Sequence, residues 1–207
     1  MSTQPIYQLF DTREQKAILE SRNSLLLFSA IEKLVIQSKA GFTLTPQLIC
    51  ELHRVVIQDI YTCAGQFRDV DVRITNTEHQ PPPWQNIGIY IDEMCKYVND
   101  NFGKSGLHLA AYLMWRQNWI HPFKGGNGRV SRGLSYLILN VRLGFLLPGL
   151  NTIPEQIVKN RIPYYNALKA ADQAERAGTI DVSQMENLLS DMLAAQLLFV
   201  HEKACGN

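Results

Sequence analysis

The chain has 207 residues, of which 46% are hydrophobic and 19% charged, and its net charge at pH 7 is +1. This composition is typical of a packed globular protein and excludes a disordered chain. The near-neutral charge gives no electrostatic footprint for nucleic acid, and no window approaches the ~18 apolar residues that a membrane span needs. We therefore expect a single domain over residues 1–207, with neither a nucleic-acid nor a membrane partner.

The N-terminal residues lack a basic segment followed by an apolar run, so no signal peptide is expected. The cysteines contain no CxxC pair and are typical of reduced thiols; they are Cys50, Cys63, Cys95 and Cys205. Both features favour a cytoplasmic location.

Most of the chain has the apolar periodicity of α-helices. Residues 14–39 form the first such segment, and Gly41 is a suitable end for it. Thr45 and Pro46 then provide an N-cap and a first helical position. Further helices are expected at residues 85–102, 105–120 and 128–144. The second of these three is apolar on nearly every side, which predicts a buried helix.

Capping signals mark the helices of the C-terminal third. Thr152 and Glu155 form a capping-box pair, and Pro163 begins a further helix. Ser183 and Glu186 have the same capping-box spacing and are expected to open the last helix.

Residues 67–83, called the flap below, interrupt the helical pattern. Apolar residues mostly alternate with polar ones there, at Phe67, Val70, Val72 and Ile74. Thr75 to Glu78 then favour a turn, and Pro81–Pro83 exclude a helix or a central strand. The flap is therefore predicted to be a short exposed β-hairpin in an otherwise all-α domain.

The segment from His121 to Arg132 reads HPFKGGNGRVSR and lies between the two most apolar helices. Gly125, Gly126 and Gly128 let the backbone fold tightly, with N–H groups directed into one concavity at the start of a helix. The helix dipole favours an anion there, above all a phosphate. Arg129 and Arg132 are neighbours on the same helix surface.

Three further residues complete this pattern. His121 is suited to remove a proton from an incoming hydroxyl near neutral pH. Asn127 is placed either to donate to a phosphate oxygen or to cap the helix. Phe123 is expected to be a buried anchor of the loop. A lone histidine or glycine cluster is usually structural, so the specificity comes from the joint pattern.

This segment resembles the core motif of the Fic-domain (Fic/Doc) family, HPFx(D/E)GNGRxxR. Residues 60–74 and 79–84 are similar to the family's target-binding flap and its entry. The resemblance covers about residues 14–190. It implies a Fic-type helical domain in which two buried central helices flank the motif loop.

The resemblance also implies an activity: a protein adenylyltransferase that moves AMP from ATP to a Ser, Thr or Tyr hydroxyl of a target protein. His121 would be the general base. Arg73, Ile74 and Thr75 of the flap would pair with the target segment. The nucleotide phosphates would be held by Lys124, Gly125, Gly126, Asn127, Gly128, Arg129 and Arg132.

Gly125 departs from the family motif, because the usual Asp or Glu at this position holds the Mg²⁺ that bridges the phosphates. Glycine offers no oxygen ligand, so no metal-ligating residue is assigned and any Mg²⁺ site is weakened. Lys124 could supply positive charge instead, although its side chain is expected to point into solvent. Three outcomes stay open: AMP transfer with altered metal dependence, transfer of another phosphate-containing group, or a lapsed module that only binds a nucleotide or a partner.

Two family variants fit the chain poorly. The phosphotransferase variant has Asn-Lys-Arg where Asn127-Gly128-Arg129 stands here. The inhibitory pattern (S/T)xxxE(G/N) has no clean match, since residues 183–187 have one residue too few, so an inhibitor would be a separate partner. Other residues favour structural roles: His53, His108, Tyr164, Tyr165, Trp115 and Trp119. For His79, a contact to the ligand and a turn position are equally compatible.

Overall fold

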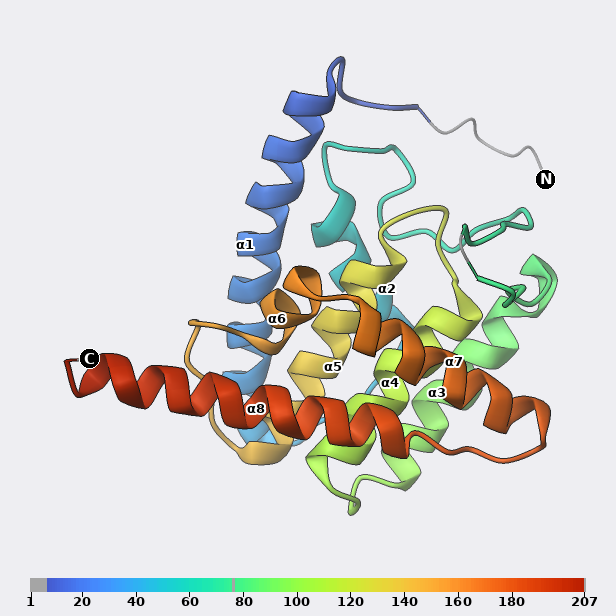
Figure 1. Cartoon of the computed structure of the whole chain (residues 1–207). Helices are drawn as coiled ribbons and strands as arrows, with labels where there is room; N and C mark the ends of the chain where they lie inside the picture. Colours follow the sequence, from blue (N-terminus) through green and yellow to red (C-terminus); the bar gives the residue numbers. More distant parts are fainter. Residues whose placement is uncertain (1–6, 76, 207) are drawn as a thin grey trace.

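A computed structural model describes residues 7–75 and 77–206 (Figure 1). Within these residues the protein is all-helical and contains no β-strand, so the all-α expectation is confirmed. Residues 1–6, which were considered for a signal peptide, and Asn76 of the expected turn lie outside the described residues. The elements are α1 (Arg13–Gln37), η1 (Ser38–Ala40), α2 (Pro46–Ile57), η2 (Trp84–Asn86), α3 (Ile87–Asp100), α4 (Gly106–Ile120), α5 (Asn127–Leu143), α6 (Ile153–Lys159), α7 (Ile162–Arg176) and α8 (Ser183–Ala204).

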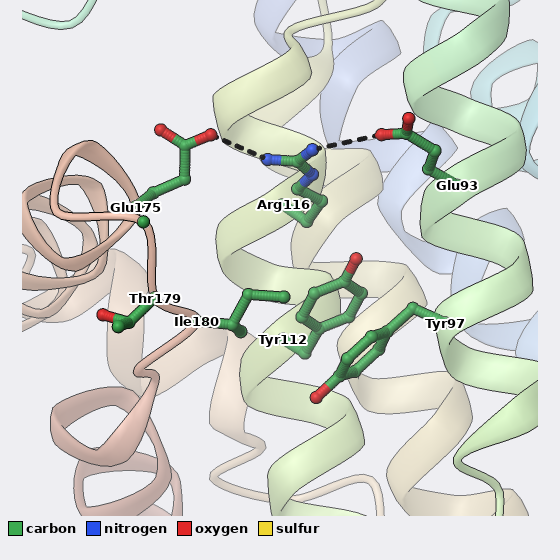
Figure 2. Close-up of a pocket in the computed structure, with 8 residues that line it drawn as sticks. Glu93, Tyr97, Tyr112, Arg116, Glu175, Thr179 and Ile180 are labelled. Atoms are coloured by element: carbon green, nitrogen blue, oxygen red, sulfur yellow. Dashed lines mark ion pairs between the residues drawn. The ribbon is translucent and has the colours of Figure 1, made fainter.

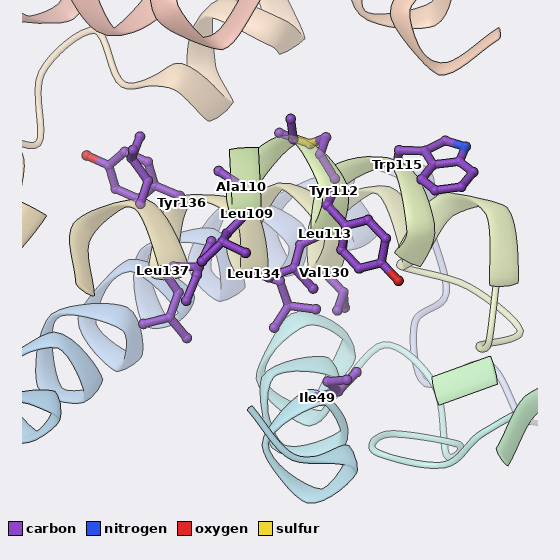
Figure 3. Packing of buried hydrophobic residues seen from close by; sticks show 14 of the residues in the cluster. Ile49, Leu109, Ala110, Tyr112, Leu113, Trp115, Val130, Leu134, Tyr136 and Leu137 are labelled. Atoms are coloured by element: carbon purple, nitrogen blue, oxygen red, sulfur yellow. The ribbon is translucent and has the colours of Figure 1, made fainter. Parts of the chain in front are cut away.

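Helices α4 and α5 lie in the middle of the helical array, with α1 and α2 on one side and α8 crossing over them (Figure 1). Leu109 and Leu113 of α4, and Leu134 of α5, are almost completely buried (Figure 3). Each such leucine contributes about 2 kcal/mol through removal of its side chain from water. The loop that joins α4 to α5 is therefore held at both ends by the core of the protein.

The local end signals of the helices are mostly confirmed. The Thr45 hydroxyl accepts the Leu48 N–H at 3.2 Å, with Pro46 as the first residue of α2. Thr152 and Glu155 form the expected capping box at the start of α6. Gly144 ends α5 in the left-handed conformation, with φ of 77°.

The second expected capping box is wrong. Val182 is the N-cap of α8, and the Ser183 N–H donates to the Asp181 carboxylate at 2.9 Å. The Glu186 carboxylate binds His108 Nδ1 of α4 at 2.8 Å. A partner from a different helix has therefore replaced the local cap that the spacing predicts.

The hairpin expected in the flap is also wrong, because the described part of residues 67–83 contains no strand. The Arg68 guanidinium joins the two arms instead: it donates to the Val70 carbonyl at 2.9 Å and to the Pro82 carbonyl at 2.5 Å. Proline lacks an N–H, so Pro81–Pro83 cannot donate to a ladder. The buried Arg68 side chain therefore holds the two arms of the flap together in place of backbone pairing.

No helix among residues 7–75 and 77–206 combines the length and the apolar character needed to cross a membrane.

Candidate anion-binding and catalytic site

His121 ends α4 and begins the loop that leads to α5. Its backbone adopts the left-handed conformation, with φ of 48° and ψ of 56°, and its N–H donates to the Gln117 carbonyl at 3.1 Å. Histidine tolerates this conformation better than most residues with a Cβ. The His121 carbonyl accepts a hydrogen bond from Arg68 Nε at 2.9 Å. The backbone of the candidate base is thus fixed by both α4 and the flap.

The surroundings of the His121 ring keep it uncharged. Burial lowers its pKa to about 4, and the positive charges of Arg68 and His79 act in the same direction, whereas the Asn118 backbone carbonyl opposes them. Nδ1 is buried with no hydrogen-bond partner among the described residues. A neutral imidazole has one unprotonated ring nitrogen, which is able to accept a proton.

Phe123 and Asn127 brace the loop from inside. Phe123 is fully buried, as expected for an anchor. The Asn127 side chain donates to the Phe123 carbonyl at 2.7 Å and accepts from the Phe123 N–H at 3.0 Å. Gly126, with φ of 77°, occupies the N-cap position of α5. The Asn127 amide is therefore committed to the loop itself, and its expected contact to a phosphate stays a prediction.

The first turn of α5 leaves backbone donors free. The Arg129 and Val130 N–H groups both donate to the Gly126 carbonyl at 3.0 Å. Within the described chain, the N–H groups of Asn127 and Gly128 have no backbone acceptor. A Cβ added to Gly128 would lie 3.2 Å from an Arg132 guanidinium nitrogen. Free donors and the Arg132 charge therefore meet at the positive end of the helix dipole.

The two motif arginines have different surroundings. Arg129 lies 3.1 Å from the Glu20 carboxylate of α1 and donates to the Val56 carbonyl of α2 at 3.3 Å. Arg132 is half-buried and forms no ion pair with any residue that the structure describes. Burial lowers its pKa, and the positive charge of Arg161 adds to this effect. Buried charges are normally neutralised, so Arg132 is the cation that an incoming anion would pair with.

Lys124 and Gly125 differ from what a metal site would need. Lys124 Nζ lies 2.5 Å from the Asp69 carboxylate, so this lysine is paired and not free in solvent. The hydrogen bond from Lys124 lowers the Asp69 pKa. A Cβ added to Gly125 would meet nothing within 4 Å, so the space for an acidic side chain exists. The motif therefore lacks an acidic metal ligand at Gly125, although an acidic side chain would fit there.

A resident divalent cation does not fit these residues. The described residues contain no group of three or more His, Cys, Asp or Glu side chains that could hold a metal ion. Hard cations require several oxygen ligands, and Asp69 is already paired with Lys124. The loop and its described neighbours therefore offer no set of oxygen ligands for Mg²⁺.

The flap presents free backbone beside the loop. Arg73 and Thr75 are exposed and Ile74 is half-buried, in a segment without strand pairing. His79 Nε2 donates to the Trp119 carbonyl at 2.8 Å, which attaches the second arm of the flap to the end of α4. His79 is thus an anchor of the flap.

Two residues of the site were not recognised from the sequence. Arg68 is 2% exposed and clamps the flap to His121, yet it stands in an alternating pattern where a charged side chain is expected to face solvent. His53 was expected to be structural, and its contacts to the loop are described below.

The two tyrosines at the start of α7 differ in their surroundings. Tyr164 is buried and its hydroxyl accepts from Asn118 Nδ2 at 2.8 Å, whereas Tyr165 is exposed.

Away from the loop, a pocket of 330 Å³ lies between α3, α4 and the α7–α8 connection (Figure 2). The cationic residue of its lining, Arg116, lies between the carboxylates of Glu93 at 3.6 Å and Glu175 at 3.7 Å. The guanidinium is already neutralised there. This pocket therefore lacks the unpaired cation that distinguishes the loop at the start of α5.

The fold and the loop together define an all-helical domain in which a helix N-terminus with free N–H groups lies next to the His121 imidazole, whose pKa is lowered by burial. Residues 43–139, which contain α2, α3, α4, the loop and most of α5, match the sequence model of the Fic/DOC family. This match assigns the region of residues 43–139, which includes the loop, to the Fic/DOC family.

Known proteins agree with this assignment. The chain is 32% identical over 130 residues to the protein adenylyltransferase Fic of Drosophila persimilis, a match that covers 61% of this chain and 24% of that protein. The chain thus spans about a quarter of the length of this curated relative. Among solved structures, Fic-1 of C. elegans is 21% identical with a TM-score of 0.70, covering 96% of this chain and 54% of that one. A Fic family protein from Desulfovibrio desulfuricans G20 is 20% identical with a TM-score of 0.69, covering 94% and 56%. These two structures share its fold.

Proposed function

We propose that this protein transfers AMP from ATP to a Ser, Thr or Tyr hydroxyl of a target protein, with altered metal dependence. The observation that carries the proposal is the half-buried Arg132, unpaired among the described residues, beside the free N–H groups of Asn127 and Gly128. This combination of charge and donors suits a polyphosphate. Curated relatives named adenylyltransferases support the choice of reaction.

The transfer itself needs one proton acceptor. The hydroxyl oxygen of the target attacks the α-phosphorus of ATP, the bond from that phosphorus to the bridging oxygen breaks, and pyrophosphate leaves. Nε2 of His121 takes the hydroxyl proton, because burial keeps the ring neutral in the free protein. The negative charge of bound ATP beside the ring raises its pKa and makes it a better base.

The target segment docks on the flap in this proposal. A segment without strand pairing in which Arg73 and Thr75 are exposed suits addition of a peptide strand. Arg68 and His79 hold the flap against the end of α4, so a docked hydroxyl would be delivered beside His121.

The missing acidic residue at Gly125 gives the proposal a specific test. The protein is incubated with target-containing lysate and ATP labelled at the α- or the γ-phosphate, with and without Mg²⁺ or Mn²⁺. We expect α-label on protein that disappears in His121→Ala. We expect Gly125→Asp to increase the metal-dependent label, since the side chain has room, and the steric control Gly125→Ala to leave it unchanged.

The alternative outcomes are distinct. Binding of nucleotide without any label would indicate a module that only binds. Label from the γ-phosphate alone would indicate a phosphotransferase. Either result overturns the proposed AMP transfer.

A further inference from the structure

His53 of α2 contacts the motif loop at Phe123 and Gly125, although it lies about 70 residues away in the sequence. Its ring is fully buried and stacks on Phe123, with centroids 3.6 Å apart and planes inclined by 10°. Nε2 lies 3.1 Å from the Gly125 carbonyl, and the Gly65 N–H donates to Nδ1 at 3.0 Å. One imidazole thus joins α2, the motif loop and the segment that leads into the flap.

These contacts define the protonation state of the ring. A carbonyl only accepts, so Nε2 carries the proton that is donated to Gly125. A backbone N–H only donates, so Nδ1 is unprotonated. Burial lowers the pKa of His53 to about 4, which keeps this neutral tautomer at physiological pH. The donor to Gly125 is therefore permanent in the folded protein.

The bond to Gly125 sets the direction of a whole peptide group. The C=O of Gly125 and the N–H of Gly126 belong to one trans peptide plane and point in opposite directions. When the carbonyl points at His53, the Gly126 N–H points away from α2. Neither Gly125 nor Gly126 has a Cβ to resist rotation of this plane, so a hydrogen bond must hold it.

Helix α2 also fixes the next residue. A Cβ on Gly126 would lie 2.8 Å from Ile57 Cγ2 and 3.1 Å from Val56 Cγ1, and the φ of Gly126 is 77°. The loop therefore packs closely against the last turn of α2 at Gly126. His53 adds a hydrogen bond from α2 to the neighbouring residue, Gly125.

We propose that His53 is a positioning residue that holds the Gly125–Gly126 peptide with its N–H turned toward the nucleotide phosphates. This inference rests on the proposed function, because it assigns those phosphates to the loop. His53 touches neither the nucleotide nor the target. It acts through the backbone of the loop.

The test uses His53→Phe, which keeps the ring packed on Phe123 and removes both hydrogen bonds. His53→Gln restores an N–H donor toward Gly125. His108→Phe is the matched control, because the His108 ring also has polar partners on both nitrogens and belongs to the α3–α4–α8 contact, away from the loop. Two quantities are measured: the affinity for a non-hydrolysable ATP analogue by calorimetry, and amide hydrogen exchange at residues 124–128.

We expect His53→Phe to weaken the affinity about tenfold, the equivalent of one well-placed hydrogen bond, and to accelerate exchange at residues 124–128. His53→Gln should recover part of both effects. His108→Phe should lower the thermal stability without changing either quantity. In steady-state kinetics, His53→Phe should raise KM for ATP more than it lowers kcat.

Unchanged affinity and unchanged loop exchange in His53→Phe would overturn the inference. If His53→Phe does not fold, His53→Gln is compared with wild type. Complete loss of affinity for the analogue in His53→Gln, while hydrogen exchange at residues 124–128 stays as slow as in wild type, would also contradict the inference. If wild type binds the analogue but transfers no AMP, the proposed reaction fails while the role of His53 is still decided by binding. If wild type binds no analogue, the phosphates are wrongly assigned and both proposals fail.

Discussion

Acidification from pH 7 to pH 5 should destabilise the fold through two buried imidazoles. Burial lowers the pKa of His53 and of His121 to about 4 from the ordinary value of 6.5. As the pH falls below 6.5, the unfolded chain takes up protons that the folded protein does not. Stability is therefore complete above pH 6.5 and is lost as the pH falls toward 4.

The magnitude follows from the distance to the ordinary pKa. At pH 5 the unfolded imidazole is 1.5 units below its pKa of 6.5, whereas the folded imidazole is still neutral. Each unit corresponds to ~1.4 kcal/mol, so each ring costs about 2 kcal/mol and both together about 4 kcal/mol. The Lys124 hydrogen bond lowers the pKa of Asp69 below its ordinary 3.8, so this carboxylate loses its stabilising pair only at a pH below this window.

Urea unfolding at pH 7, 6 and 5 measures this loss. His121→Ala should remove about half of the pH dependence, since one of the two rings is gone. Leu197→Ala is the control for the substitution itself, because Leu197 is exposed on α8 and its replacement removes no titratable group. A loss below about 1 kcal/mol in wild type, or an undiminished slope in His121→Ala, would refute the reasoning.

Three further substitutions distinguish packing, charge and capping. Gly126→Ala should destabilise the protein by about 3 kcal/mol in thermal unfolding, because its Cβ would meet Ile57 at 2.8 Å with a backbone φ of 77°. Arg132→Gln should weaken ATP binding in calorimetry without lowering the melting temperature, whereas Arg129→Gln should lower the melting temperature because it breaks the ion pair with α1. Thr152→Ala should cost about 1 kcal/mol and leave ATP binding unchanged, as expected for a cap at the start of α6.

Local signals in the sequence predict the helices because their causes are local. The Thr45 cap, the Thr152–Glu155 capping box and the Gly144 end each depend on residues within one turn of the helix, and all three are present. The burial of α4 follows from apolar residues on nearly every side. Such features need no knowledge of the rest of the chain.

Long-range partners explain where sequence reasoning was wrong. The alternation in the flap is real, but Arg68 turns inward and bonds to the Val70 and Pro82 carbonyls. Glu186 has the spacing of a capping box, but His108 is 78 positions away in the sequence and binds its carboxylate. In both cases a side chain finds a distant partner that no local pattern reveals.

Side chains that contact the loop also support the proposed anion site. The Ile120 and His121 carbonyls accept from Arg68, and the Gly125 carbonyl accepts from His53. The Phe123 carbonyl accepts from Asn127. Donors from the flap and from α2 satisfy the first three of these acceptors, and Asn127 satisfies the fourth from within the loop. The N–H groups of Asn127 and Gly128 have no backbone acceptor among the described residues.

A backbone segment whose carbonyl groups are hydrogen-bonded and whose N–H groups are free favours the binding of an anion. The motif supplies the glycines and the arginines for this arrangement. Arg68 and His53 supply the direction, because each turns loop carbonyls toward the protein interior. The phosphate preference that we propose would therefore be a property of the α2, flap and loop contacts together, and substitutions far from the motif in sequence should change nucleotide affinity as strongly as substitutions within it.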